Sequence, residues 1–366
     1  MINKLSSSSK TSMVKRILTG LVLMAVVIPC LVFGDWAFFA LSILLAVFGI
    51  HEILKAPGSG RYSLPIKIAV YFFVLSFIYW TFIKSWADSS DPNPFNGSST
   101  FYLNNIFVSI LGIILYAMVL FLIAVCTPKV QLSDVTYLFT VGLFFALGFQ
   151  GMLFLRYFPN SSGITYMGAT TIPVEWGTGV TCKTYFSDYY QYRGLSQSFN
   201  SCLAFIFMLI GTWGADVGAY FIGVLFGKHR MNPRISPHKT WEGFFGGFVF
   251  SMAASLGFAA VCEFAFDSPL VPGILQFSHS PLLQATGVMD GTAWPFLFGI
   301  AFLMPIVGNV GGFAFSLIKR QFGIKDFGTI FPGHGGVIDR FDSILTNSIM
   351  ISIVMLITAN GWNLLV

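Results

Sequence analysis

Nine long apolar stretches account for most of this 366-residue chain and restrict what it can fold into. They lie at residues 17–33, 36–54, 66–83, 106–126, 135–154, 199–225, 243–263, 294–318 and 344–362. Each is close to the ~20 apolar residues that a helix needs to cross the hydrocarbon core of a bilayer. Only 10% of the residues are charged, against about a quarter in a soluble domain. The sequence therefore predicts an all-α, polytopic transmembrane helix bundle with about nine spans.

The basic residues are divided unevenly between the two sides of these spans. With the amino terminus in the cytoplasm, sixteen of the twenty Lys and Arg residues fall in the amino-terminal tail and the cytoplasmic connections. The opposite side holds only Lys84, Arg156, Lys183 and Arg193. This positive-inside pattern predicts the orientation. The net charge of +5 reflects topology, so we expect membrane lipids and no nucleic acid among the partners.

The chain divides into three regions by composition. Residues 1–16 form a polar cytoplasmic tail, 17–198 hold amino-terminal transmembrane helices with a non-cytoplasmic loop, and 199–366 form a carboxy-terminal transmembrane domain. In the amino-terminal spans, His51 and Glu52 are the exceptional ionisable side chains, and we interpret them as an interfacial pair facing lipid headgroups. Polar groups suited to chemistry concentrate in the third region, on its cytoplasmic side.

Asp216 is the first of these groups and lies deep in the sixth apolar stretch. A carboxylate inside a span costs roughly 3 kcal/mol on insertion scales, so its presence needs an explanation. One explanation is a hydrogen bond to a neighbouring helix. Small residues around Asp216 allow close helix packing but also leave room for a metal ion, and we predict a metal ligand here.

A basic connection at 227–243 follows the same stretch. Ser236 precedes a proline and forms a stiff turn. Lys239 and Thr240 then open the next helix, where backbone N–H groups favour anions. We predict that these three residues bind phosphate. The positive-inside rule already explains the other basic residues of this connection, Lys228, Arg230 and Arg234.

Residues 316–342 form the densest polar cluster, with three carboxylates, four cationic side chains and a glycine-histidine turn. Asp339 and Asp342 are three residues apart, so on a helix they share a face and can hold one cation. Asp326 lies upstream of the turn. Glycines there, Gly335 and Gly336 among them, let backbone N–H groups approach a phosphate. The positive charge comes from Lys319, Arg320, Lys325 and Arg340.

These features together indicate phosphoryl or nucleotidyl transfer onto a lipid at the cytoplasmic face. A lipid phosphate is already anionic, so its attack needs charge neutralisation and alignment rather than a strong general base. Metal ions, Lys and Arg supply that function. His334 is the one obvious titratable histidine of the cluster.

The order of these residues resembles the signature of the phosphatidate cytidylyltransferases (CDP-diacylglycerol synthases). The matching pattern is Ser316-x-x-Lys319-Arg320-x4-Lys325-Asp326, followed by Pro332-Gly333-His334-Gly335-Gly336-x-x-Asp339-Arg340-x-Asp342. The segments around Asp216 and Ser236–Gly243 also resemble this family. Together these motifs make the resemblance close over roughly residues 205–345. Two positions depart from the common pattern, Ala215 and His238.

The resemblance implies transfer of the cytidylyl group of CTP to phosphatidate with Mg²⁺, and a homodimer. It implies catalytic roles for Asp326, Asp339, Asp342, Lys325, His334 and Arg340. It implies substrate contacts for Ser236, Lys239, Thr240, Lys319, Arg320, Gly335 and Gly336. It implies metal binding by Asp216, Asp326, Asp339 and Asp342. An Asp339→Asn variant is expected to lose turnover while remaining folded and inserted.

Three alternatives and the compartment stay open at this point. A polyprenol or phytol kinase, or a CDP-archaeol synthase, also uses CTP at a membrane, and a cation-coupled transporter would use Asp216 as an ion site. Asn-x-Ser sequons at Asn96 and Asn160 favour the endoplasmic reticulum membrane, with a bacterial inner membrane as the alternative. In either case we expect an integral membrane protein whose active site faces the cytoplasm.

Overall fold

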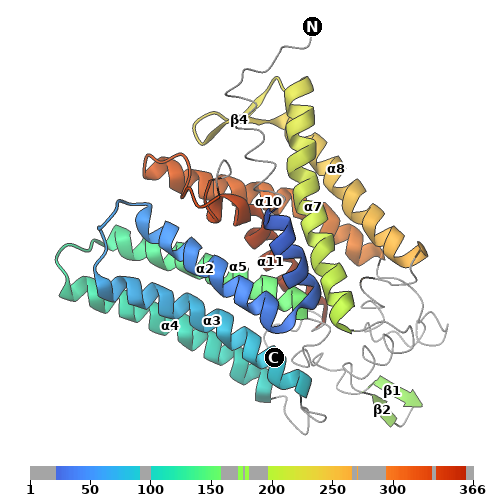
Figure 1. Cartoon of the computed structure of the whole chain (residues 1–366), viewed down its shortest axis with the longest axis horizontal. Coiled ribbons are helices and arrows are strands. Elements are labelled where there is room, and N and C mark those ends of the chain that lie inside the picture. The colour runs from blue at the N-terminus through green and yellow to red at the C-terminus, as the bar shows by residue number, and fades with distance from the viewer. Residues whose placement is uncertain are drawn as a thin grey trace.

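The computed structural model describes residues 22–90, 100–157, 172–175, 178–180, 197–265, 270, 294–331 and 335–359. These residues are almost entirely helical (Figure 1). After a first helix at Val22–Phe33, the helices are α2 (Asp35–Lys55), α3 (Leu64–Ser90), α4 (Thr100–Cys126), α5 (Leu132–Tyr157), α7 (Gln197–Phe226), α8 (Trp241–Ala260) with the short π-helix η1 (Val261–Ala265), α10 (Trp294–Gln321) and α11 (Ile338–Ala359).

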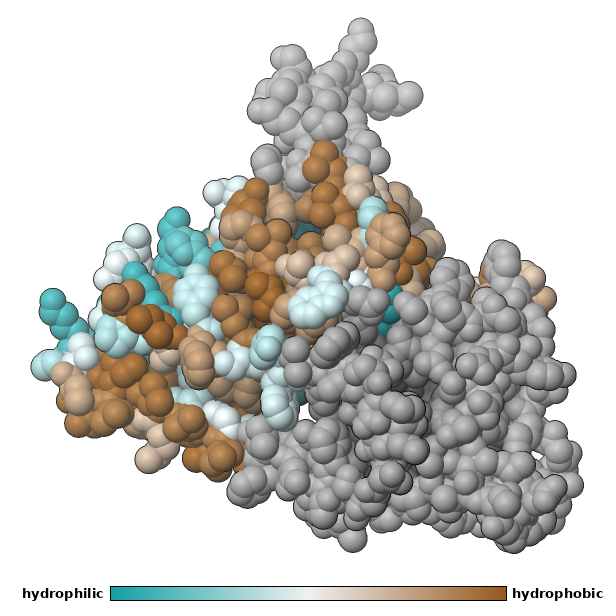
Figure 2. All heavy atoms as spheres, turned by 60° about the horizontal axis from the view of Figure 1, so that its bottom comes forward, coloured by the Kyte–Doolittle hydropathy of each residue, from teal (hydrophilic) through white to brown (hydrophobic). Residues whose placement is uncertain are grey.

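Every one of the nine predicted stretches is helical where it is described. Seven of these helices are long and apolar enough to cross a membrane. Large apolar side chains cover much of the helical surface, as the brown areas of Figure 2 show. Helix α4 is the extreme case, because only 11% of its apolar window is buried inside the protein. The prediction of an all-α polytopic membrane protein is confirmed.

Two short antiparallel hairpins interrupt the helices. Strands β1 (Ile172–Glu175) and β2 (Thr178–Val180) lie in the connection between α5 and α7. Strands β3 (Arg230–Asn232) and β4 (Ser236–Thr240) connect α7 to α8. In the second hairpin, Arg230 lies opposite Thr240 and Asn232 lies opposite Ser236. The basic connection predicted from sequence therefore carries a defined hairpin directly before α8.

Small residues let α7 and α8 pack backbone against backbone. A Cβ added at Gly247 would lie 2.5 Å from the carbonyl oxygen of Ala215, and one added at Gly243 would lie 2.8 Å from that of Ala219. In a membrane, where apolar surface gains little by leaving lipid, such close approach is the main source of helix association. This contact holds the part of α7 that carries Asp216 against the first turns of α8.

Helix α11 packs against α5 and α10 through polar as well as small residues. The hydroxyl of Ser348 donates to the carbonyl oxygen of Gly148 at 2.8 Å, and that of Ser352 donates to Gly151 at 3.3 Å. The amide of Asn347 donates to the hydroxyl of Thr212 on α7 at 2.9 Å. These bonds satisfy polar groups at membrane depth and join α11 to both halves of the chain.

Adding a methyl group at Gly151 is expected to destabilise the protein. A Cβ there would lie 2.8 Å from the backbone carbonyl carbon and oxygen of Ser348, which cannot rotate away. Overpacking of this kind typically costs about 1–3 kcal/mol. Gly151→Ala should therefore lower the thermal unfolding temperature in detergent. The matched control is Gly257→Ala on α8, where nothing lies within 4 Å; equal behaviour of the two variants would contradict the prediction.

Candidate functional site

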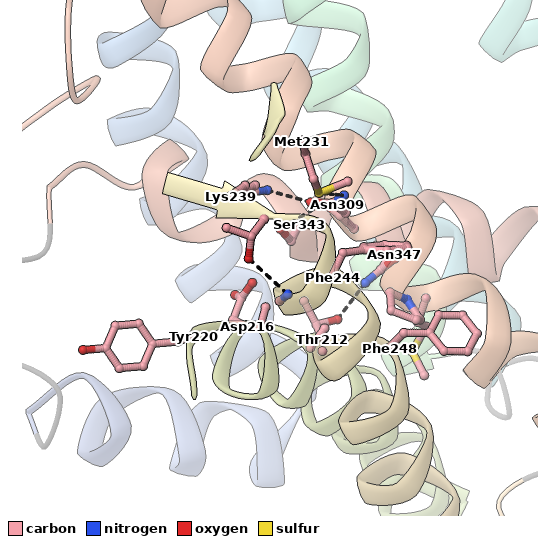
Figure 3. A pocket seen from close by; sticks show the side chains of 18 of the residues that line it. Thr212, Asp216, Tyr220, Met231, Lys239, Phe244, Phe248, Asn309, Ser343 and Asn347 are labelled. Atoms are coloured by element: carbon pink, nitrogen blue, oxygen red, sulfur yellow. Dashed lines mark hydrogen bonds between the residues drawn. The ribbon is translucent and has the colours of Figure 1, made fainter. Parts of the chain in front are cut away.

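A cavity of about 220 Å³ lies among α7, α8, α10 and α11, next to the β3–β4 hairpin (Figure 3). Its walls are partly aromatic and apolar and include Phe244 and Phe248 of α8 and Met304 of α10. The polar side chains that line it come from α7, the hairpin, α10 and α11: Thr212, Asp216, Tyr220, His238, Lys239, Thr240, Asn309, Ser343 and Asn347. A small polar site enclosed by membrane-spanning helices is a functional-site candidate by default.

The hairpin and the start of α8 place Lys239 in this cavity. The side-chain oxygen of Thr240 accepts the N–H of Gly243 at 3.1 Å and caps α8, which fixes the residue before it. The Lys239 ammonium donates to Oδ1 of Asn309 at 2.8 Å and lies 4.6 Å from the ring centroid of Phe313. Burial lowers the pKa of Lys239 below its ordinary value, and the carboxylates of Asp342 and Asp216 act in the opposite direction.

Two carboxylates share this site with the lysine. Asp216 on α7 lines the cavity, and Asp342 on α11 interacts electrostatically with both Asp216 and Lys239. A Cβ added at Gly312 on α10 would lie 3.0 Å from the Lys239 nitrogen and 3.7 Å from Oδ2 of Asp342, so this glycine leaves space between them. The structure therefore brings together three residues that the sequence predicted for the site, over 126 positions of chain from Asp216 to Asp342.

Asp339 has different surroundings from Asp342. Its Oδ1 accepts the Lys319 ammonium at 2.9 Å, and its Oδ2 accepts the N–H groups of Phe327 and Gly336 at 2.8 and 3.0 Å. The side chains of Lys319 and Asp339 are only 13% and 6% exposed. Both Asp339 oxygens thus already bind protein groups, and Gly336 uses its N–H for Asp339 rather than offering it to a phosphate. The metal-ligand role of Asp339 stays a prediction.

The remaining predicted residues that the structure describes lie outside the cavity wall. Lys325, Asp326 and Arg340 are exposed. Arg320 donates from Nε to the carbonyl oxygen of Ile235 at 3.2 Å and ties the end of α10 to the β3–β4 hairpin. Ser236 pairs within the hairpin, and Gly335 has a φ of 87° in the turn before α11. The substrate contacts of both residues stay predictions. His334 falls outside the described residues.

Sequence reasoning missed Asn309, Ser343 and Asn347 as parts of the cavity wall. Asn309 interrupts the apolar stretch at 294–318, and a polar side chain inside a span is itself a signal of function. Ser343 follows Asp342 directly, and its hydroxyl donates to the carbonyl oxygen of Gly308 at 3.2 Å. Glu52 was interpreted wrongly as facing headgroups: it is 2% exposed and accepts hydrogen bonds from the start of α11.

The donor set around Asp216 and Asp342 suits a divalent cation that also binds phosphate. Among the described residues, no group of three or more His, Cys, Asp or Glu side chains forms a self-sufficient metal cage. Mg²⁺ is usually bound by one or two carboxylates, with substrate phosphates and water completing its shell. Two carboxylates beside a lysine therefore fit Mg²⁺ bound together with a phosphorylated substrate.

Removing the negative charge of Asp339 is expected to destabilise the protein, since Lys319 would be left partly buried without its anionic partner. Breaking a buried ion pair typically costs about 3–5 kcal/mol. Asp339→Asn should therefore lower the unfolding temperature in detergent, so the loss of turnover expected from the sequence has to be measured below that temperature, where the variant is folded. Adding Lys319→Met should recover part of the loss, because it removes the unpaired cation. Strictly additive effects of the two substitutions would contradict this account of the pair.

A family model described as "Cytidylyltransferase family" matches residues 14–358. A protein named phosphatidate cytidylyltransferase from Mycobacterium bovis is 36% identical over 149 residues, 40% of this chain and 40% of that protein. Proteins of the same name from Staphylococcus epidermidis and Mycobacterium leprae are 36% and 34% identical over 143 residues. These matches cover 44% and 37% of the two relatives' own length and 39% of this chain.

Proposed function

This chain belongs to the cytidylyltransferase family, and we propose that it transfers the cytidylyl group of CTP to phosphatidate, giving CDP-diacylglycerol and pyrophosphate. The observation that carries the proposal is that Asp216 and Lys239 line one cavity between membrane-spanning helices, with the carboxylate of Asp342 beside Lys239. The relatives named phosphatidate cytidylyltransferase support this choice of substrates.

In the proposed reaction, an oxygen of the lipid phosphate forms a bond to the α-phosphorus of CTP. The bond from that phosphorus to the bridging oxygen breaks, and pyrophosphate leaves with the electron pair. Lys239 holds a phosphate oxygen and neutralises charge that would otherwise repel the anionic lipid phosphate. Its hydrogen bond to Asn309 fixes the ammonium in the cavity. No side chain has to remove a proton, because the attacking phosphate is already anionic.

We propose that Asp216 and Asp342 hold Mg²⁺, which would neutralise the phosphate oxygens and the leaving pyrophosphate. A chelator should abolish cytidylyl transfer, and Mg²⁺ in excess should restore it. A second measurement does not depend on turnover: the paramagnetic resonance signal of bound Mn²⁺ should appear in the wild-type protein and disappear in Asp216→Asn. Transfer that persists in chelator, or unchanged Mn²⁺ binding by the variant, would contradict this proposal.

The unequal distribution of basic residues supports an active site facing the cytoplasm. Lys239 and the 316–342 cluster lie at the helix ends assigned to that side. Asp216, Lys239 and Asp342 meet at one place instead of lining a path across both leaflets, which favours an enzyme over a transporter. Placement in the endoplasmic reticulum stays a prediction, and the relatives named here come from bacteria. The homodimer also stays a prediction.

The substrates are tested by supplying the purified, detergent-solubilised protein with one nucleotide and one acceptor at a time. CTP with phosphatidate and Mg²⁺ should give CDP-diacylglycerol, identified by mass. UTP or ATP in place of CTP, and a polyprenol or phytol in place of phosphatidate, should give far less product. Phosphorylated prenol or phytol as the main product would replace the proposal with a lipid kinase, and a preference for unsaturated archaeal ether lipid would favour a CDP-archaeol synthase.

A further inference from the structure

The carboxylate of Glu52 connects the amino-terminal half of the chain to the start of α11. Its Oε1 accepts the N–H of Val337 at 2.9 Å, and its Oε2 accepts the N–H of Ile338 at 3.0 Å. The residue is only 2% exposed. The bonds join positions 285 and 286 residues apart in the sequence. The N–H groups at the start of helix α11 thus bind a side chain supplied by α2.

The start of a helix is a favourable place for a buried carboxylate, but here a second carboxylate lies close by. The first N–H groups of a helix have no partners within the helix, and the positive end of the helix dipole attracts an anion. A buried carboxylate without such partners would be costly. Asp339 lies close enough to repel Glu52 electrostatically. Two carboxylates are therefore concentrated at one helix start despite their mutual repulsion.

Two glycines of the 316–342 cluster fit directly around the Glu52 carboxylate. A Cβ added at Gly328 or at Gly336 would collide with its oxygens. Neither glycine is among those with positive φ in the described residues, so contact with Glu52 accounts for the absence of a side chain there. Glu52 therefore fills the space between the segment after α10 and the segment that enters α11.

We propose that Glu52 is a positioning residue of the active site. It fixes where α11 begins, and with it Asp339, whose oxygens bind Lys319, Phe327 and Gly336. Asp342 follows one turn later on the same helix, where its carboxylate lies beside Lys239 of the cavity and interacts electrostatically with Asp216. Displacement of the helix start displaces this carboxylate. This inference rests on the proposed function, because it assigns Glu52 a role in that same site.

The first test compares Glu52→Ala and Glu52→Gln with His51→Ala, an exposed neighbour on α2. Misplacement of a catalytic group by about 1 Å can cost about 10²-fold in rate. We expect Glu52→Ala to lower kcat by about 10-fold to 100-fold at a temperature well below its unfolding, with KM for CTP and phosphatidate changed less than about threefold. Glu52→Gln keeps one acceptor and should retain more activity than Glu52→Ala. An unchanged kcat per folded molecule in Glu52→Ala, with only a lower unfolding temperature, would overturn the proposal.

The second test uses the close contact between Glu52 and Gly336, which leaves no space for a Cβ at position 336. Gly336→Ala should lower kcat in the wild-type background and be much better tolerated in the Glu52→Ala background, where the added methyl group has space. Independent effects of the two substitutions would overturn the proposal. Hydrogen exchange of the Val337 and Ile338 amides, measured without substrate, should accelerate in Glu52→Ala and stay unchanged in His51→Ala. The exchange measurement separates the two proposals. Equal exchange rates in Glu52→Ala and the wild type would show that Glu52 does not hold α11. Faster exchange in Glu52→Ala, together with a wild-type protein that transfers no cytidylyl group, would refute only the proposed function.

Discussion

Asp342→Asn is expected to lower kcat for cytidylyl transfer by about 10³-fold. The substitution keeps the size of the side chain but removes the negative charge that lies beside Lys239 and interacts electrostatically with Asp216. A neutral amide binds Mg²⁺ poorly, so the charge of the reacting phosphates is no longer compensated. The rate of CDP-diacylglycerol formation under saturating CTP and phosphatidate is the measurement.

The loss of activity in Asp342→Asn should not be accompanied by a loss of stability. Asp216 and Asp342 repel each other, and removing one charge from a strained functional site commonly leaves stability unchanged or raises it. The unfolding temperature of Asp342→Asn in detergent should therefore equal or exceed that of the wild type. Glu263→Gln, at the other end of α8 in η1, is the matched control and should retain full activity. A kcat of Asp342→Asn within tenfold of the wild type would remove Asp342 from the proposed metal site.

Lys239→Met is expected to lower kcat/KM for CTP by about 10²-fold to 10³-fold. Methionine retains much of the length and apolar stem of lysine, so the main loss is the ammonium group. This group donates a hydrogen bond to Asn309 and interacts electrostatically with Asp216 and Asp342. Lys239→Arg should not restore activity, because the Lys239 ammonium already fills the space that Gly312 provides: a Cβ added at Gly312 would lie only 3.0 Å from it. The larger guanidinium would not fit there. Initial rates over a range of CTP concentrations measure the effect.

A second lysine of the same connection provides the control. Lys228 is exposed and precedes β3, and the positive-inside rule alone explains its charge. Lys228→Met should change kcat/KM for CTP less than about twofold, as surface substitutions usually do. Equal effects of Lys228→Met and Lys239→Met would indicate a general electrostatic contribution of the loop instead of a specific phosphate contact.

The helices of this protein were predictable because each is encoded locally. A run of about 20 apolar residues has few alternatives to a membrane span, and the structure forms a helix in every predicted stretch. Asp216 and Lys239 were also predictable, since a charged residue within or beside a span is costly and needs a partner. In these cases the composition of a short window carries the whole signal.

The remaining parts of the site depend on contacts between distant segments. Helical spacing predicts that Asp339 and Asp342 share a face, yet they bind different groups. Asp339 lies in the first turn of α11 and bonds to the N–H groups of Phe327 and Gly336. Glu52 looks like an interfacial residue in its own segment, because its partners lie 285 and 286 residues away. Only the packing of α2 against the loop before α11 reveals its role.

The most direct test of cytidylyl transfer follows the two ends of the CTP phosphate chain. The purified protein receives Mg²⁺, phosphatidate and CTP labelled either at the α-phosphate or at the γ-phosphate. The account predicts that α label enters the lipid while γ label is released as pyrophosphate, and that Asp342→Asn does neither. Entry of γ label into the lipid, with release of CDP, would contradict the account and identify a kinase.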